Sequence, residues 1–256
     1  MAFTEPARWY VISLRPQGEH AALRRAARKR GARVLALSPW RLRFRDDADT
    51  RKSLDVALAA DRVLFTSPVA VRAAAALASL SPLPGQAWIA VGAGTAEALR
   101  LTGVTQVQAP ARMDSEGLLD LPALQALQGV TVGLVTAPEG RGVLAPSMAE
   151  RGATVLRADI YERVPLPLSK AAIARLIALR APAFLALSSA GALEHVLAEL
   201  PGDAADHLRS LPVVAASARL QRIALEAGFR TVRVAEGPAS GQLVQAASEA
   251  NIAGIR

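Results

Sequence analysis

The stretch Arg30-Gly-Ala-Arg-Val-Leu35 recurs as Arg151-Gly-Ala-Thr-Val-Leu156, 121 positions later in the chain. The correspondence continues on both sides of these six residues, and its offset drifts only from 121 to 125. The further matched positions are Val11 with Val132, Leu23 with Leu144, Trp40 with Tyr161, Thr66-Ser67 with Ser188-Ser189, Gly103 with Gly228, Ser115 with Ser240, and Leu118 with Leu243. A repeat of this length indicates two copies of one structural unit, with few insertions between them.

Each copy alternates short β-rich runs with Ala-rich segments whose apolar residues recur every three or four positions. This alternation is typical of parallel sheets covered by helices, so the predicted fold class is α/β with two similar domains. Several helices are predicted to end at glycine, namely at Gly31, Gly103, Gly152 and Gly228. The predicted strands are Trp9–Leu14, Arg33–Leu37, Arg62–Phe65, Trp88–Val91, Val104–Gln108, Val130–Val135, Thr154–Tyr161, Ala183–Leu187, Val213–Ala215 and Thr231–Val234.

Two segments rich in Arg or Pro, Ser38–Asp49 and Ile160–Leu168, each follow the second strand of a copy. If both cross between domains as extended linkers, the domains exchange their first strand–helix–strand units. The predicted organisation is a discontinuous domain 1 (1–38 plus 168–256), a domain 2 (45–160), linkers at about 39–44 and 161–167, and a cleft between the domains.

Composition excludes several classes of protein. The 256 residues include no Cys, which excludes a disulfide scaffold, a thiolate metal site and a Cys nucleophile. The N-terminal residues do not resemble a signal peptide, and no apolar run reaches the roughly 18 residues of a membrane span, so we expect a soluble cytoplasmic protein. The net charge of +8 favours anionic partners, although compositional bias also explains it.

Polar turns follow many of the predicted strands, at the end of a parallel sheet where ligands bind. Taken singly, each is explained by helix capping; as a set facing one cleft, they would suit carboxylates. These turns are Thr66-Ser67-Pro68, Gly92-Ala-Gly94-Thr95, Asp114-Ser115-Glu116-Gly117, Ser188-Ser189-Ala-Gly191, Ser217-Ala-Arg219 and Ser240-Gly241. The turn at Gly92 lacks the third glycine of a dinucleotide fingerprint, and the chain has no P-loop.

Other chemistry-bearing residues have plainer interpretations. His20, His195 and His207 have no metal-site or triad spacing and are predicted to be solvated helix residues. The cluster Asp46, Asp47 and Asp49 is predicted to be a solvated loop. The basic run Arg24–Arg30 is predicted to be the solvated face of a helix, opposite Leu23 and Ala27. Tyr161 is predicted from its chemistry to pack at the start of the second linker.

Several short motifs together resemble bacterial uroporphyrinogen-III synthases in order and spacing, over essentially the whole chain. The motifs are Leu14-Arg-Pro16, Phe65-Thr-Ser-Pro-Val-Ala-Val-Arg72, Val91-Gly-Ala-Gly-Thr-Ala96, Asp114-Ser-Glu-Gly-Leu-Leu119, Gly140-Arg141, Arg151-Gly-Ala153, Tyr161-Glu-Arg163 and Ser217-Ala-Arg219. The resemblance implies two α/β domains joined by two linkers, and an active site in the cleft that converts hydroxymethylbilane, a linear tetrapyrrole with eight carboxylates, into uroporphyrinogen III. It also implies that neither a metal nor a cofactor is used.

By motif matching, the resemblance implies that Tyr161 assists departure of the substrate hydroxyl. It further implies that Thr95, Ser188, Ser189, Ser217 and Arg219 line the cleft, and to these we add Thr66, Ser67, Arg15 and Arg141 as carboxylate contacts. Ala190 departs from the family by replacing a hydroxyl that some relatives carry. The expected enzyme is a monomer that binds neither nucleic acid nor membrane and can make transient contact with hydroxymethylbilane synthase.

Two alternatives from other classes remain open on the sequence. A non-catalytic two-lobed protein that closes on an anionic metabolite would have the same fold and the same amide-rich turns. A nucleic-acid-binding regulator would use the Arg24–Arg30 helix, and its affinity for a random duplex would depend on salt.

Overall fold

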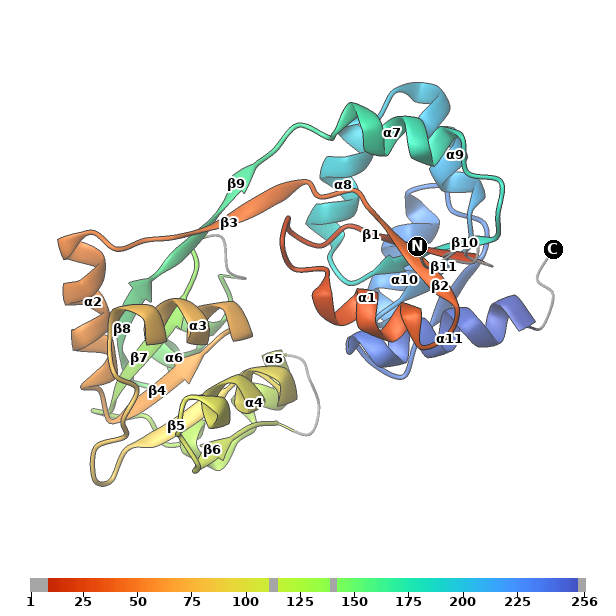
Figure 1. Ribbon diagram of the computed structural model, residues 1–256. Helices are drawn as coiled ribbons and strands as arrows, with labels where there is room; N and C mark the ends of the chain where they lie inside the picture. The colour runs from red at the N-terminus through yellow and green to blue at the C-terminus, as the bar shows by residue number, and fades with distance from the viewer. Residues whose placement is uncertain (1–8, 111–114, 139–141, 253–256) are drawn as a thin grey trace. The chain divides into compact units, whose positions relative to one another are not determined.

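The computed structural model describes residues 9–110, 115–138 and 142–252, and the chain divides into two compact units. Unit 1 comprises residues 1–41 and 164–256, and unit 2 comprises residues 42–163. In Figure 1, unit 1 therefore contains both the red N-terminal and the blue C-terminal segments, whereas unit 2 runs from orange to green.

Unit 1 is built on a five-stranded parallel sheet with the order β12-β11-β10-β1-β2. Its strands are β1 (Trp9–Ser13), β2 (Ala32–Ala36), β10 (Ala183–Leu187), β11 (Val213–Ala215) and β12 (Val232–Val234). One face packs against α1 (Ala21–Arg28) and α11 (Ser240–Ile252), and the other against α7 (Lys170–Ile177), α8 (Ala190–Glu199), α9 (Gly202–Ser210) and α10 (Ala218–Glu226). Because both faces are covered, the central strand β10 is apolar and buried throughout.

Unit 2 repeats this architecture with the strand order β6-β5-β4-β7-β8. Its strands are β4 (Arg62–Phe65), β5 (Ala87–Ala90), β6 (Val107–Gln108), β7 (Thr131–Thr136) and β8 (Thr154–Asp159). One face packs against α2 (Ala48–Leu58), α3 (Pro68–Leu77) and α4 (Ala93–Leu101), and the other against α5 (Ser115–Leu119), the 3-10 turn η1 (Pro122–Leu124) and α6 (Leu144–Glu150).

The two sheets have the same order once each strand is matched to its copy in the repeat. β1 and β2 correspond to β7 and β8, while β4, β5 and β6 correspond to β10, β11 and β12. Each sheet therefore takes two strands from one copy and three from the other. The predicted α/β class with parallel sheets is confirmed, and so are the four glycine helix ends, whose φ angles lie between 68° and 97°.

Two further strands pair with each other in the segments predicted to be extended linkers. β3 (Trp40–Phe44) pairs with β9 (Tyr161–Pro165) to form a two-stranded ribbon. Across the ribbon Arg43 forms an ion pair with Glu162. A main-chain hydrogen bond lies beside this pair, in which the amide of Arg45 donates to Ile160 O over 3.0 Å. The segments are thus extended, but they are strands and not isolated linkers.

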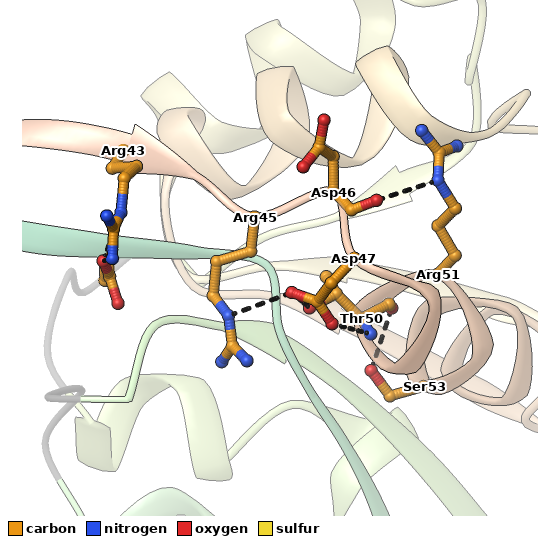
Figure 2. Close-up of polar contacts among 8 residues, drawn as sticks. Arg43, Arg45, Asp46, Asp47, Thr50, Arg51 and Ser53 are labelled. Carbon is orange, nitrogen blue, oxygen red and sulfur yellow. Dashed lines mark hydrogen bonds and ion pairs between the residues drawn. The ribbon is translucent and has the colours of Figure 1, made fainter.

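The acidic cluster after β3 is exposed, as predicted, but only Asp46 lies in a loop; Asp47 and Asp49 belong to the start of a helix. Asp47 is the N-cap of α2, where its carboxylate accepts hydrogen bonds from Thr50 N at 2.9 Å and Thr50 Oγ1 at 2.8 Å (Figure 2). These hydrogen bonds lower the pKa of Asp47 below its usual value. Asp49 lies in the first turn of the same helix, where a negative charge is favourable. Within the described ranges no helix is long and apolar enough to cross a membrane.

Candidate active site

The carboxyl ends of the strands in unit 2 bring together four hydroxylated side chains. Thr66 and Ser67 directly follow β4, Thr136 ends the neighbouring strand β7, and Tyr161 follows β8. β4 and β7 are hydrogen-bonded neighbours in a parallel sheet, so their carboxyl ends share one edge. This edge is where a parallel α/β sheet binds ligands.

Tyr161 has a buried ring and a hydroxyl that reaches this edge. Only 5% of the residue is exposed, and its ring belongs to the apolar core of unit 2. Its Oη lies 3.0 Å from Ser67 Oγ. Ser67 is the N-cap of α3, and its Oγ also accepts a hydrogen bond from Ala70 N at 3.0 Å. Tyr161 therefore packs in the core and also makes a polar contact. Its partner, the Ser67 hydroxyl, is held in place because it caps the N-terminus of α3.

Thr66 and Thr136 form a second polar contact at the same edge. Thr66 Oγ1 donates to Thr136 Oγ1 over 2.8 Å, and Thr136 is 2% exposed. Thr136 was not among the predicted site residues. The repeat contained the signal, because at the offset of 121 Thr136 corresponds to Arg15, which was selected.

Thr95 is the exception among the predicted residues of unit 2. It lies in the first turn of α4, beyond β5, as the glycine turn predicted. Its exposure is only 2%, and its amide donates to Gly92 O over 3.0 Å. Thr95 therefore offers a ligand almost no surface in this conformation, and its place in the site stays a prediction. Arg141 lies outside the described residues.

In unit 1 the predicted residues follow β10, β11 and β1. Ser189 and Ser217 are the N-caps of α8 and α10, with their hydroxyls accepting from Ala192 N at 3.3 Å and Leu220 N at 3.4 Å. Capping alone therefore accounts for these two hydroxyls. Ser188 and Arg219, next to them in sequence, are exposed and make no side-chain hydrogen bond with any other described residue. These two side chains can contact a ligand without breaking a cap.

Arg15 follows β1 and is half-buried. Burial lowers the pKa of its guanidinium below the usual value, and the nearby Glu19 opposes that change. The group still carries its charge at neutral pH, because the ordinary arginine pKa is far above 7. A desolvated guanidinium at a strand end is a strong partner for carboxylates.

His20 is not the solvated helix residue that the sequence predicted. It is 5% exposed, and it bridges two serines: Nδ1 lies 3.0 Å from Ser13 Oγ, and Nε2 lies 2.9 Å from Ser38 Oγ. Burial, followed by the charges of Arg24 and Arg15, lowers its pKa to about 4, so His20 is neutral at physiological pH. The sequence did not reveal this bridge, because its partners are two serines that lie 7 and 18 positions from His20 and form no motif with it. No group of three or more potential metal ligands occurs among the residues described.

Comparison with known proteins identifies the family. A family model described as uroporphyrinogen-III synthase HemD matches residues 21–245. Uroporphyrinogen-III synthase of Escherichia coli (strain K12) is 27% identical over 161 residues, which cover 62% of this chain and 65% of the relative. The enzyme of Salmonella typhimurium (strain LT2) is 28% identical over the same shares. The chain thus matches just under two thirds of the length of these relatives.

Solved structures share the fold over nearly the whole chain. A mutant uroporphyrinogen III synthase from the extremely thermophilic bacterium Thermus thermophilus has a TM-score of 0.64 and 21% identity, covering 95% of this chain and 99% of its own. Uroporphyrinogen-III synthetase from Helicobacter pylori 26695 has a TM-score of 0.58 and 16% identity, covering 96% and 99%. Since the family model spans most of the chain, this protein belongs to the uroporphyrinogen-III synthase family.

Proposed function

We propose that this protein cyclises hydroxymethylbilane to uroporphyrinogen III with loss of one water molecule and inversion of the last pyrrole ring. The observation that carries the proposal is the Tyr161–Ser67 pair, which holds a phenol at the carboxyl end of the unit 2 sheet, the edge at which we expect the substrate to bind, in a chain of this family. The reaction neither oxidises nor reduces the substrate, so it needs no redox cofactor. We include in the proposal a monomeric, cytoplasmic enzyme that receives its substrate from hydroxymethylbilane synthase by transient contact.

The first step is departure of the substrate hydroxyl. The C–O bond breaks, its electron pair goes to oxygen, and the pyrrole nitrogen stabilises the azafulvene cation that remains. Tyr161 transfers its phenol proton to the departing oxygen, which leaves as water, and the tyrosinate takes back the proton that the substrate loses when the ring closes. The hydrogen-bond chain is compatible with this direction: Ala70 N–H donates to Ser67 Oγ, which leaves the Ser67 O–H able to donate to Tyr161 Oη and the phenol proton available to the substrate.

The second step forms the inverted ring. The substituted carbon of the last ring attacks the azafulvene carbon to give a spiro intermediate, which fragments at one carbon–carbon bond and recloses in the opposite sense with loss of a proton. The electron-rich pyrroles drive this chemistry, so the protein's task is to hold the chain in one conformation. We assign carboxylate contacts to Arg15, Ser188 and Arg219 in unit 1 and to Thr66 in unit 2. Ser188 and Thr66 directly follow β10 and β4, Arg15 lies just beyond β1, and Arg219 is in the first turn of α10 after β11, and all four carry polar atoms suited to an anion.

We expect Tyr161→Phe to slow turnover about tenfold or more, equivalent to about 1.4 kcal/mol in the activation free energy. The ring still fills the core, so the change removes only the hydroxyl, with its contact to Ser67 Oγ and its hydrogen bond to the departing oxygen. The chain has two tyrosines, so Tyr10→Phe is the matched control. It removes a phenol hydroxyl from unit 1 and leaves the Tyr161–Ser67 pair of unit 2 unchanged. Single-turnover rates of both variants measure the effect. Equal rates for Tyr161→Phe and the unmodified protein would leave Tyr161 with packing alone.

A coupled assay tests the activity itself. Hydroxymethylbilane is generated fresh, the protein is added, and the products are oxidised and separated as porphyrin isomers I and III. We expect isomer III to predominate over a protein-free control that yields isomer I. Isomer I alone, from protein shown to be folded by circular dichroism, would contradict the proposal and favour a non-catalytic binding protein.

A further inference from the structure

Unit 1 contains a hollow that none of the predicted site residues lines. Its volume is about 450 Å³. It lies beside the end of β2, where residues preceding α1, the start of α7 and the ends of both connecting segments meet. The wall residues that bear on binding are His20, Arg24, Ser38, Ser169 and Arg175.

The charge of these walls is positive. Arg24 on α1 and Arg175 on α7 line the hollow, and none of the wall residues is Asp or Glu. Among the described residues neither guanidinium has an ion-pair or hydrogen-bond partner for its side chain. An anion bound in the hollow is attracted by both guanidinium groups.

Neutral polar groups complete the walls. Ser38 and Ser169 supply hydroxyls. Ser169 is the N-cap of α7 without a side-chain capping bond, so its hydroxyl is not committed to the helix. Ser38 Oγ also lies 2.9 Å from His20 Nε2, and when that nitrogen donates, the Ser38 proton is available to an occupant. The remaining surface is largely aliphatic. At roughly 30 Å³ per water molecule the hollow has room for about 15 waters, which is more than a single inorganic ion requires. A mixed cationic and aliphatic wall of this size suits an organic molecule with acidic groups.

We propose that this hollow is a binding site for a small organic anion that carries at least two carboxylates, held by Arg24 and Arg175 with hydrogen bonds from Ser38 and Ser169. The site goes beyond the proposed function, since its walls belong to unit 1 and include none of the residues assigned above to the substrate. An occupant also touches both connecting segments, because Ser38 precedes β3 while Leu166 and Pro167 follow β9. The carboxylates come either from the acidic side chains of the tetrapyrrole or from a separate metabolite.

Citrate titration followed by NMR tests the site on the full-length protein at constant ionic strength, with chloride as the balancing anion. His20 lines the hollow and reports occupancy through its ring nitrogens, while the amides of Ala171 and Ala172 report from α7. We expect saturable shifts at these positions. Arg24→Gln and Arg175→Gln should each weaken binding about fivefold, or about 1 kcal/mol.

Matched controls separate a site from general attraction to a basic surface. Arg28→Gln removes the same charge one turn further along α1, and Lys170→Gln removes one charge at the start of α7; neither residue lines the hollow. We expect these two variants to bind citrate within about twofold of the unmodified protein. Shifts that do not saturate, or equal weakening in all four variants, would overturn the proposal and reduce the binding to charge screening.

The cyclisation assay distinguishes the two sources of carboxylate. If the substrate's own side chains occupy the hollow, citrate competes with hydroxymethylbilane and Arg175→Gln raises KM. If a separate metabolite does so, citrate binds while KM stays unchanged in both arginine variants. Citrate binding is measured without turnover, so a protein that binds citrate but yields only isomer I would disprove the proposed function and not this site.

Discussion

Gly133→Ala is expected to lower the free energy of unfolding of unit 2 by about 3 kcal/mol, at the upper end of the range for overpacking a core. A Cβ on Gly133 would lie 1.9 Å from Ala57 O, 2.7 Å from Ala57 C and 3.0 Å from Ala57 Cα. These are backbone atoms of α2, which packs directly on β7 and β8, so no side-chain rotation relieves the clash. The helix must move away by about 1.5 Å, which opens the core around Leu54.

Hydrogen exchange of the amides in β4 and β7, measured at increasing urea concentration, reports the stability of unit 2 separately from that of unit 1. Gly142→Ala is the matched control in the same unit, because Gly142 is exposed and a Cβ there meets nothing within 4 Å. Adding Ala57→Gly to Gly133→Ala should restore nothing, since the clash is with main-chain atoms. Gly133→Ala with protection equal to that of Gly142→Ala would show that α2 does not pack on β7 this closely.

The fold could be predicted from the sequence because the repeated stretches and the strand periodicity can each be recognised in short runs of residues. Arg30–Leu35 and Arg151–Leu156 mark the same helix end and the same strand, β2 and β8, in the two sheets. The pairing of β3 with β9 was not predicted, although both segments were marked as extended. Arg43 and Glu162 are 119 positions apart, and no periodicity reveals which extended segments pair.

Part of the candidate site could also be predicted from short sequence patterns. Tyr161 and Ser67 were both selected from turn and motif patterns, but their 3.0 Å contact joins residues 94 positions apart. Patterns of hydroxylated turns also cannot tell an exposed hydroxyl from a capping one, so Ser188 and Ser189 were selected alike although only Ser189 caps a helix. Whether a side chain is buried depends on how the whole unit packs, which a local sequence pattern does not reveal. For this reason His20 was predicted to be solvent-exposed, although it is buried between two serines.

Unit 1 is expected to lose about 3 kcal/mol of stability as the pH falls from about 6.5 to 4, through His20 alone. The unfolded chain protonates this histidine near pH 6.5, whereas burial and the charges of Arg24 and Arg15 lower its pKa in the folded protein to about 4. Between these values the unfolded state binds a proton that the folded state does not, so acid favours unfolding; below pH 4 the loss is complete. Protonation also forces both ring nitrogens to donate, to Ser13 Oγ and Ser38 Oγ together.

His20→Gln isolates this contribution, because its amide offers one donor and one acceptor to the two serines but does not titrate. The measurement is hydrogen exchange of the β1 and β10 amides against urea at pH 7, 5.5 and 4, compared between the two proteins. All three histidines lie in unit 1, so exchange in β4 and β7 of unit 2 provides an internal reference for general acid effects. We expect the stability difference between the proteins to change by about 3 kcal/mol over this interval. Parallel curves for the two proteins would mean that His20 titrates alike in the folded and unfolded chain, and that its bridge between Ser13 and Ser38 does not depend on a neutral ring.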